Sequence, residues 1–163
     1  MNRSPETRTR RLQPGEADVC EQILRSLPDW FGIEDAIVQY RRDLDRMETL
    51  VAVLGEEVIG FLAIHEHNAH SAEIHVVAIR PESHRRGIGR ALFAHAEGLL
   101  RGRSIEFLQV KTLGPSRPDK SYDRTRDFYM AMGFRPLEEN KLWGERNPCL
   151  IMVKHLACPR SGQ

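Results

Sequence analysis

The chain has 163 residues, of which 40% are hydrophobic and 29% are charged, and its formal net charge at pH 7 is +1. This length and composition are typical of one globular domain with its own hydrophobic core. The near-neutral balance excludes a bulk electrostatic attraction to nucleic acid or to an anionic membrane, and no apolar run approaches the length of a membrane-spanning helix.

The ends of the chain and its cysteines bear on domain limits and location. The N-terminus is rich in arginine but lacks the apolar stretch of a secretory signal peptide. The three cysteines are widely spaced and odd in number, which fits a reducing compartment without a disulfide framework. We therefore expect a cytoplasmic protein with a disordered lead-in over residues 1–9, one domain over residues 10–156 and a tail over residues 157–163.

Apolar spacing in the first half of the chain predicts two helices followed by strands. Val19, Ile23 and Leu24 form a helical stripe, and a polar turn at His65–Ser71 separates a predicted hairpin from a central strand. The expected elements are a short strand at Arg10–Leu12, a helix that starts near Ala17, a helix at Ile33–Leu44, and strands at Thr49–Leu54, Val58–Ile64 and Glu73–Ile79.

The second half alternates between helices and strands. Gly133 is expected to end the second of these helices, and a long loop rich in glycine, proline and charge precedes that helix. The expected elements are a helix at Gly89–Arg101, a strand at Ile105–Val110, a loop at Thr112–Ser121, a helix at Asp123–Met132, and strands at Phe134–Leu137 and Cys149–Val153. This order indicates a single layered domain of the α/β or α+β class.

The segment from Glu73 to Leu92 predicts an anion-binding turn. Its strand ends at Arg80-Pro81, and Gly87 and Gly89 precede a helix rich in alanine and leucine. Glycine lets the backbone approach a ligand closely, and a helix start offers unpaired N–H groups and the positive end of the helix dipole. With the arginines beside them, these features predict a cradle for an anion, most naturally a phosphate.

Two common phosphate-binding motifs do not fit this segment. A P-loop ends in Gly-Lys-Ser/Thr, whereas Gly89 is followed by Arg90 and Ala91. A dinucleotide-binding fingerprint needs a third glycine where Leu92 stands. It also needs an acidic residue at the end of the next strand, which ends in Gln109-Val110-Lys111.

A third interpretation fits both this segment and a later one. The turn resembles the acetyl-CoA-binding signature of the GNAT N-acetyltransferase superfamily, Q/R-x-x-G-x-G/A, with Gly87 and Gly89 at the glycine positions and His84 at the Q/R position. The segment Phe128–Phe134 resembles the FYxxxGF pattern of the same family. The two motifs have the order and spacing of the family, and the likeness extends loosely over residues 9–156.

The resemblance implies a fold and a cosubstrate. The fold would be a GNAT-like α/β domain with a mixed, mostly antiparallel sheet, flanked by helices, whose strands four and five splay apart. The cosubstrate would be acetyl-CoA, with its thioester arm on the backbone of the central strand and its pyrophosphate on the glycine turn. The implied cofactor-binding residues are Val77, Ala78, Ile79, Arg85, Arg86, Gly87, Ile88, Gly89, Arg90, Ala91 and, on the pantetheine arm, Tyr122.

The resemblance also implies an N-acetyltransferase that moves an acetyl group to a primary amine of a small molecule or peptide by direct attack. Tyr129 stands at the thiolate-protonating tyrosine of the family, although a tyrosine that only packs on the sheet is the alternative. Glu73 and His75 alternate onto one face of the central strand, and either could accept the amine proton. Glu73 is preferred, because many relatives relay protons through a carboxylate on this strand.

Two other functions stay open. His84 and Tyr122 depart from the residues that the family usually has at these positions, Q/R and asparagine. These departures are compatible with a non-catalytic, regulatory acyl-CoA-binding module. His65, His67 and His70 could begin a transition-metal site, but a polar turn is favoured and no metal is expected, because no further ligand set is evident. We expect acetyl-CoA and a small amine or peptide acceptor as partners, but no nucleic acid or membrane. We expect the protein to be a monomer or a homodimer.

Overall fold

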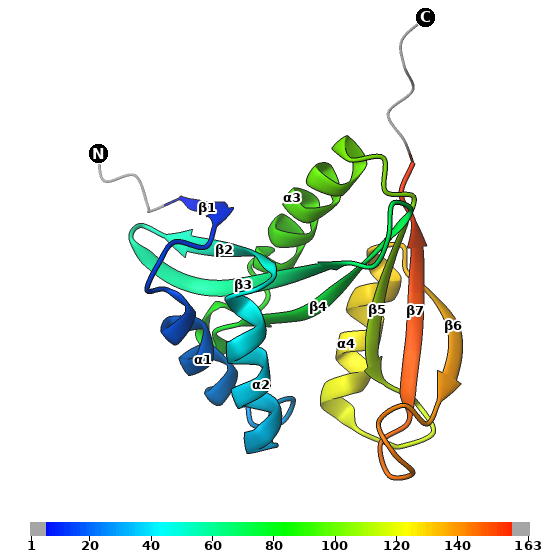
Figure 1. Ribbon diagram of the computed structural model, residues 1–163. Coiled ribbons are helices and arrows are strands. Elements are labelled where there is room, and N and C mark those ends of the chain that lie inside the picture. Colours follow the sequence, from blue (N-terminus) through cyan, green and yellow to red (C-terminus); the bar gives the residue numbers. More distant parts are fainter. Residues whose placement is uncertain (1–5, 158–163) are drawn as a thin grey trace, which may run out of the picture. The chain divides into compact units, whose positions relative to one another are not determined.

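The computed structural model describes residues 6–157, in which seven strands form one mixed sheet in the order β1-β2-β3-β4-β5-β7-β6 (Figure 1). The turn Pro81–Ser83 is a short 3-10 helix. The other elements are β1 (Thr7–Arg11), α1 (Ala17–Arg25), α2 (Glu34–Leu44), β2 (Glu48–Leu54), β3 (Glu57–Glu66), β4 (Ser71–Ile79), α3 (Ile88–Gly102), β5 (Phe107–Leu113), α4 (Lys120–Ala131), β6 (Arg135–Asn140) and β7 (Cys149–His155).

The pairing of the strands confirms the predicted fold class, an α/β domain with a mostly antiparallel mixed sheet. β1 with β2, β2 with β3, β5 with β7 and β6 with β7 pair antiparallel, and β4 pairs parallel with β5. The parallel register joins Ser71–Ile74 to Phe107–Val110. The splaying of strands four and five stays a prediction.

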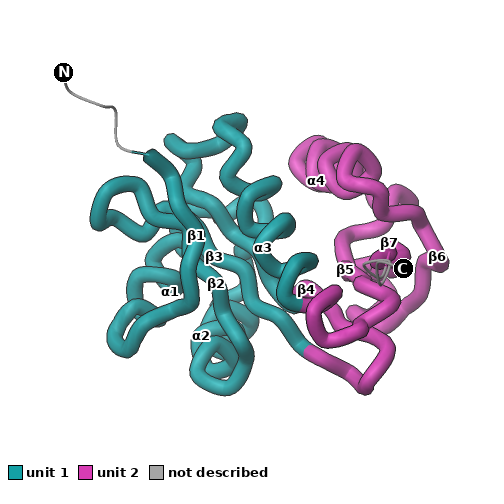
Figure 2. Tube along the Cα trace, turned by 90° about the horizontal axis from the view of Figure 1, so that it is seen from above, with its two compact units in different colours: residues 1–65, 75–99 teal, residues 66–74, 100–163 magenta. Residues whose placement is uncertain are grey.

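The described chain divides into two compact units (Figure 2). The first unit comprises residues 6–65 and 75–99, and the second comprises residues 66–74 and 100–157. The strand β4 belongs to both, because Ser71–Ile74 lies in the second unit and His75–Ile79 in the first. The predicted domain limits at residues 10 and 156 stay a prediction.

In the first unit, α1 and α2 lie side by side against the strands, and α3 lies on the other side of these strands (Figure 1). The helical stripe predicted for α1 is confirmed, because Cys20, Ile23 and Leu24 are completely buried. They pack against apolar side chains of β2, β3 and β4, among them Phe61 and Ala78. Burial of this apolar area is the main driving force for folding of the unit.

In the second unit, β5 and β7 form the inner strands, and β6 is the exposed outer strand beside β7. The helix α4 lies beside β5. It begins at Lys120, three residues before the predicted start, because the Asp119 carboxylate accepts hydrogen bonds from the N–H groups of Ser121 and Tyr122 at 2.9 and 3.1 Å. This N-cap satisfies backbone donors that a helix otherwise leaves unpaired.

Other element limits also differ from expectation. β1 begins at Thr7, so Thr7–Thr9 belong to a strand and not to a disordered lead-in, because they pair with Ala52–Leu54 of β2. β3 continues to Glu66, and β5 begins two residues later than predicted and reaches Leu113. The lead-in before residue 6 and most of the tail, with Cys158, lie outside the described residues.

Two further findings bear on location. Cys20 and Cys149 are free and buried, and a cytoplasmic location stays a prediction from the sequence. Within residues 6–157, no helix combines the length and the hydrophobicity that crossing a membrane requires.

Candidate functional site

The glycine turn of the first unit has the backbone of an anion cradle. Arg85 and Gly87 have φ angles of +62° and +74°, in the left-handed region that favours glycine. A Cβ atom on Gly87 would meet no atom within 4 Å, so the space in front of this residue is open. The helix α3 begins at the next residue, Ile88, and its first N–H groups have no intrahelical partner.

Three exposed arginines surround this backbone. Arg85, Arg86 and Arg90 are exposed, and none of their side chains makes a hydrogen bond or an ion pair within residues 6–157. Positive charge is therefore concentrated on the turn and the first residues of α3, in a chain whose net charge is only +1. Gly89, in contrast, is buried in the first turn of α3 and does not have a positive φ. Of the two motif glycines, Gly87 thus provides the left-handed backbone of the turn, whereas Gly89 is part of the first turn of the helix.

His84, the residue that departs from the family signature, ties this loop to the end of β4. Its Nε2 lies 2.8 Å from the carbonyl oxygen of Ile79, and because a carbonyl only accepts, Nε2 carries the proton. Its ring also contacts Trp30 edge to face, with centroids 6.1 Å apart. His84 therefore holds the glycine turn against the end of β4. That end contains Val77, Ala78 and Ile79, whose backbone is predicted to contact acetyl-CoA.

In the second unit, the FYxxxGF segment is the C-terminal cap of α4. The N–H of Phe134 donates to the carbonyl of Tyr129 at 3.0 Å, and the N–H of Gly133 donates to that of Met130 at 3.1 Å. These two bonds define a Schellman motif, which requires a left-handed residue after the helix. Gly133 supplies it with a φ of +98°, which confirms the predicted helix stop.

The same cap fixes the ring of Tyr129. This side chain is 6% exposed, and its ring lies 5.7 Å from the ring of Phe134 and 5.7 Å from that of Phe128. The contact with Phe134 is the hydrophobic contact that commonly accompanies a Schellman motif. Tyr122 lies half-buried in the first turn of the same helix.

Glu73 is the centre of a polar cluster in the second unit. Its Oε1 atom accepts from Lys111 Nζ at 2.8 Å and from Gln109 Nε2 at 2.7 Å, and it lies 3.2 Å from His67 Nε2. Glu73 is only 5% exposed, so it is a buried carboxylate with polar partners and not a solvated one. Burial raises the pKa of Glu73, but the bonds from Lys111 and Gln109, the charge of Lys111 and the contact with His67 together lower it.

The lowered pKa of Glu73 predicts a pH dependence of stability. A carboxylate whose pKa is lower in the folded than in the unfolded state stabilises the fold fully above its ordinary value of 4.5, and this contribution is lost as the pH falls through the folded-state pKa. Urea unfolding between about pH 6 and about pH 3 should therefore show a smaller loss of stability for Glu73→Gln than for the wild type. Parallel curves would contradict the lowered pKa.

His75, the other candidate base, has a different set of partners. Its Nε2 atom lies 2.8 Å from the Asp43 carboxylate of α2, and its ring contacts Tyr40 at 5.4 Å. Both of these partners are in the first unit, whereas the cluster around Glu73 lies in the second. Sequence alternation pointed to the two candidate bases but missed Lys111 and Gln109, although these two also alternate along β5.

The histidine-rich turn offers no metal site among the described residues. Within residues 6–157, no group of three or more His, Cys, Asp or Glu side chains is placed to hold a metal ion. His67 faces Glu73, and His70 Nδ1 lies 3.0 Å from a carboxylate oxygen of Glu106. Both histidines are therefore engaged in pairwise contacts with acidic side chains.

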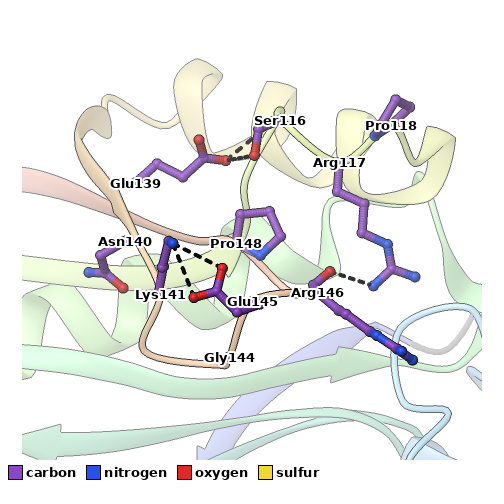
Figure 3. Close-up of a pocket in the computed structure, with 10 residues that line it drawn as sticks. All are labelled: Ser116, Arg117, Pro118, Glu139, Asn140, Lys141, Gly144, Glu145, Arg146 and Pro148. Atoms are coloured by element: carbon purple, nitrogen blue, oxygen red, sulfur yellow. Dashed lines mark hydrogen bonds and ion pairs between the residues drawn. The ribbon is translucent and has the colours of Figure 1, made fainter.

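The long loop before α4 lines a cavity of about 420 Å³ in the second unit (Figure 3). Ser116 and Arg117 form one wall, and the segment between β6 and β7 forms the other. Glu139 accepts from the hydroxyl of Ser116 at 2.8 Å, and Lys141 pairs with Glu145 across that segment.

The aromatic residues in loops divide into two groups. Trp30 and Phe31 are half-buried and pack against the core of the first unit. Trp143 lies between β6 and β7 and is 41% exposed. Trp30 and Phe31 therefore cap the core of the first unit, whereas the side chain of Trp143 is partly open to solvent.

Known proteins share the sequence and the fold of this chain. Residues 17–134 match the acetyltransferase (GNAT) family. An uncharacterized N-acetyltransferase of Chlorobaculum tepidum is 29% identical over 126 residues, which are 75% of this chain and 69% of that protein.

Two solved structures show the likeness of the fold. A GNAT-family protein from Desulfovibrio desulfuricans has a TM-score of 0.81 at 18% identity, over 93% of this chain and 100% of its own. A GNAT acetyltransferase from Elizabethkingia anophelis, solved with acetyl-CoA bound, has a TM-score of 0.69 at 17% identity, over 92% of this chain and 98% of its own. The family match covers most of the chain, and both motifs lie in it or at its end. The chain therefore belongs to the GNAT acetyltransferase family.

Proposed function

We propose that the protein transfers an acetyl group from acetyl-CoA to a primary amine of a small molecule or peptide by direct attack of the amine on the thioester. The observation that carries this proposal is the cradle of the first unit. Its open, left-handed Gly87 and its unpaired arginines, Arg85, Arg86 and Arg90, have the chemistry that a pyrophosphate needs. The acetyl-CoA bound to the Elizabethkingia relative supports the same cosubstrate.

Each part of acetyl-CoA has a proposed contact. The pyrophosphate lies on the segment Arg85–Ala91, where Gly87, Ile88 and Gly89 contribute backbone N–H groups. The thioester carbonyl and the pantetheine arm contact the backbone of Val77–Ile79, so the apolar side chains of these residues are no obstacle. Tyr122 contacts the pantetheine arm. No metal takes part in this reaction.

Tyr129 is proposed to stabilise the leaving thiolate. Tyrosine has an ordinary pKa near ~10 and a thiol near ~8.5, so complete proton transfer is uphill by about 2 kcal/mol. A hydrogen bond from the hydroxyl, donated as negative charge develops on sulfur, avoids this cost. The ring contacts with Phe128 and Phe134 constrain the ring that carries this hydroxyl.

Glu73 is proposed to receive the acceptor. The ordinary pKa of a lysine-like amine is about 10.4, far above that of a carboxylate whose pKa is lowered by Lys111 and Gln109. Glu73 therefore binds the ammonium form and passes its proton on to water, and it does not retain that proton. His75 remains the alternative relay, with Asp43 as the carboxylate that orients its ring.

Titration calorimetry with acetyl-CoA tests the cradle. The wild type should bind with micromolar affinity, and the double variant Arg86→Ala/Arg90→Ala should bind about a hundredfold more weakly, because each charge-assisted hydrogen bond contributes roughly 1.5–3 kcal/mol. Arg124→Ala is the matched control, since Arg124 is also exposed and unpaired within the described residues but lies on α4. Equal affinities of the double variant and the control would remove the pyrophosphate site from the proposal.

A turnover assay then separates the two functions that the family allows. Release of the CoA thiol in the presence of a broad panel of primary amines is expected for the transferase. Tight binding of acetyl-CoA without thiol release for any amine would contradict the transferase proposal. It would support the alternative, a non-catalytic acyl-CoA-binding module.

A further inference from the structure

The cluster around Glu73 contains a cation that the proposed reaction does not use. Lys111 Nζ lies 2.8 Å from Glu73 Oε1, and the side chains of the two residues are 23% and 7% exposed. Both residues belong to the second unit, where the parallel register places Glu73 opposite Gln109, two positions before Lys111. The ion pair is therefore built into neighbouring strands of one sheet and is not a contact between mobile surface side chains.

This pair has unused bonding capacity on both partners. All three donors around Glu73 converge on Oε1, and none of them contacts Oε2. The ammonium of Lys111 carries three N–H groups, and its one hydrogen bond within the described residues is to Glu73. Within the described residues, one carboxylate oxygen of Glu73 and two ammonium N–H groups of Lys111 thus have no hydrogen-bond partner.

The charges of the pair decide which acceptors fit. A polyamine brings further ammonium groups close to Lys111, and like charges in a partly buried site repel strongly. A simple monoamine can bind Glu73 but leaves the N–H groups of Lys111 unsatisfied. An amine with a carboxylate on the neighbouring carbon satisfies both partners, because its ammonium faces Oε2 and its carboxylate faces Lys111.

We propose that the Glu73–Lys111 pair selects a zwitterionic acceptor, the α-amine of a free amino acid, with Lys111 as the specificity-determining residue. This inference rests on the proposed function, since it names the substrate class of the same site. His67 and Gln109 keep the Glu73 carboxylate in one orientation, so the ammonium of the acceptor is held at Oε2.

The test compares each amino acid of a panel with the amine in which hydrogen replaces its carboxylate. For the wild type, kcat/KM should favour amino acids by at least about tenfold, the effect of one charge-assisted contact. Lys111→Met should reduce this preference to about unity, whereas Lys111→Arg should retain it, because arginine keeps the cation. Lys111→Gln replaces the methionine variant if that variant does not fold, as judged by circular dichroism.

The outcomes separate this inference from the proposed function. If amines react but amino acids are not preferred, or if the preference survives in Lys111→Met and Lys111→Gln, the inference is wrong and the transferase stands. If no amine reacts, the transferase is wrong, and binding of the amino acids by saturation-transfer NMR decides the inference. Binding that weakens about tenfold in the Lys111→Gln variant would then support the zwitterion site, and absence of binding to the wild type would overturn it.

Discussion

Replacing Phe134 by alanine is expected to lower the free energy of unfolding by about 3–5 kcal/mol, the usual cost of truncating a buried phenylalanine. Phe134 is completely buried, and its N–H and ring both contact Tyr129 at the end of α4. The variant therefore leaves a cavity and loses the hydrophobic contact of the Schellman motif. Denaturation in urea, followed by circular dichroism, measures the change.

Leu137→Ala is the matched control for this prediction. Leu137 lies three residues further along on β6 and is 64% exposed. Surface substitutions of this kind usually change stability by no more than about 0.5 kcal/mol. A loss below about 1 kcal/mol for Phe134→Ala, or an equal loss for the control, would show that Phe134 does not anchor the end of α4.

Replacing Tyr129 by phenylalanine is expected to reduce kcat about a hundredfold, equivalent to about 2.7 kcal/mol of lost transition-state stabilisation. The substitution keeps the ring that packs against Phe128 and Phe134 and removes only the hydroxyl. Stability and acetyl-CoA affinity should therefore change little. Thiol release at saturating acetyl-CoA and amine, with wild type and variant compared, measures the effect.

Tyr122→Phe is the control for the tyrosine prediction. Tyr122 is proposed to contact the pantetheine arm, so loss of its hydroxyl should weaken acetyl-CoA binding with little change in kcat. Equal kcat values for Tyr129→Phe and the wild type would leave Tyr129 as a packing residue of α4. That is the role the sequence already allowed as the alternative.

The sequence by itself predicted the fold class, most elements and the cradle because these depend on local signals. Hydrophobic periodicity, glycines in left-handed positions and a proline at a strand end each act over a few neighbouring residues. Such signals can therefore be recognised in the sequence alone. Gly133 illustrates this, since its predicted role as a helix stop is the Schellman cap that the structure shows. The errors lie at the ends of elements. At Thr7, for example, pairing with β2 extends the first strand further toward the N-terminus than the composition of this segment predicts.

Only the tertiary structure decided which side chains surround the candidate bases. Glu73 and Lys111 are 38 positions apart in sequence, and the parallel register of β4 and β5 brings them into contact. His75 likewise reaches Asp43 only because α2 packs near β4. The pKa of a carboxylate depends on these through-space neighbours and on burial, which alternation along one strand cannot reveal. The residues of the proposed anion cradle could therefore be recognised from local sequence. The surroundings of the candidate base Glu73 could be determined only from the tertiary structure.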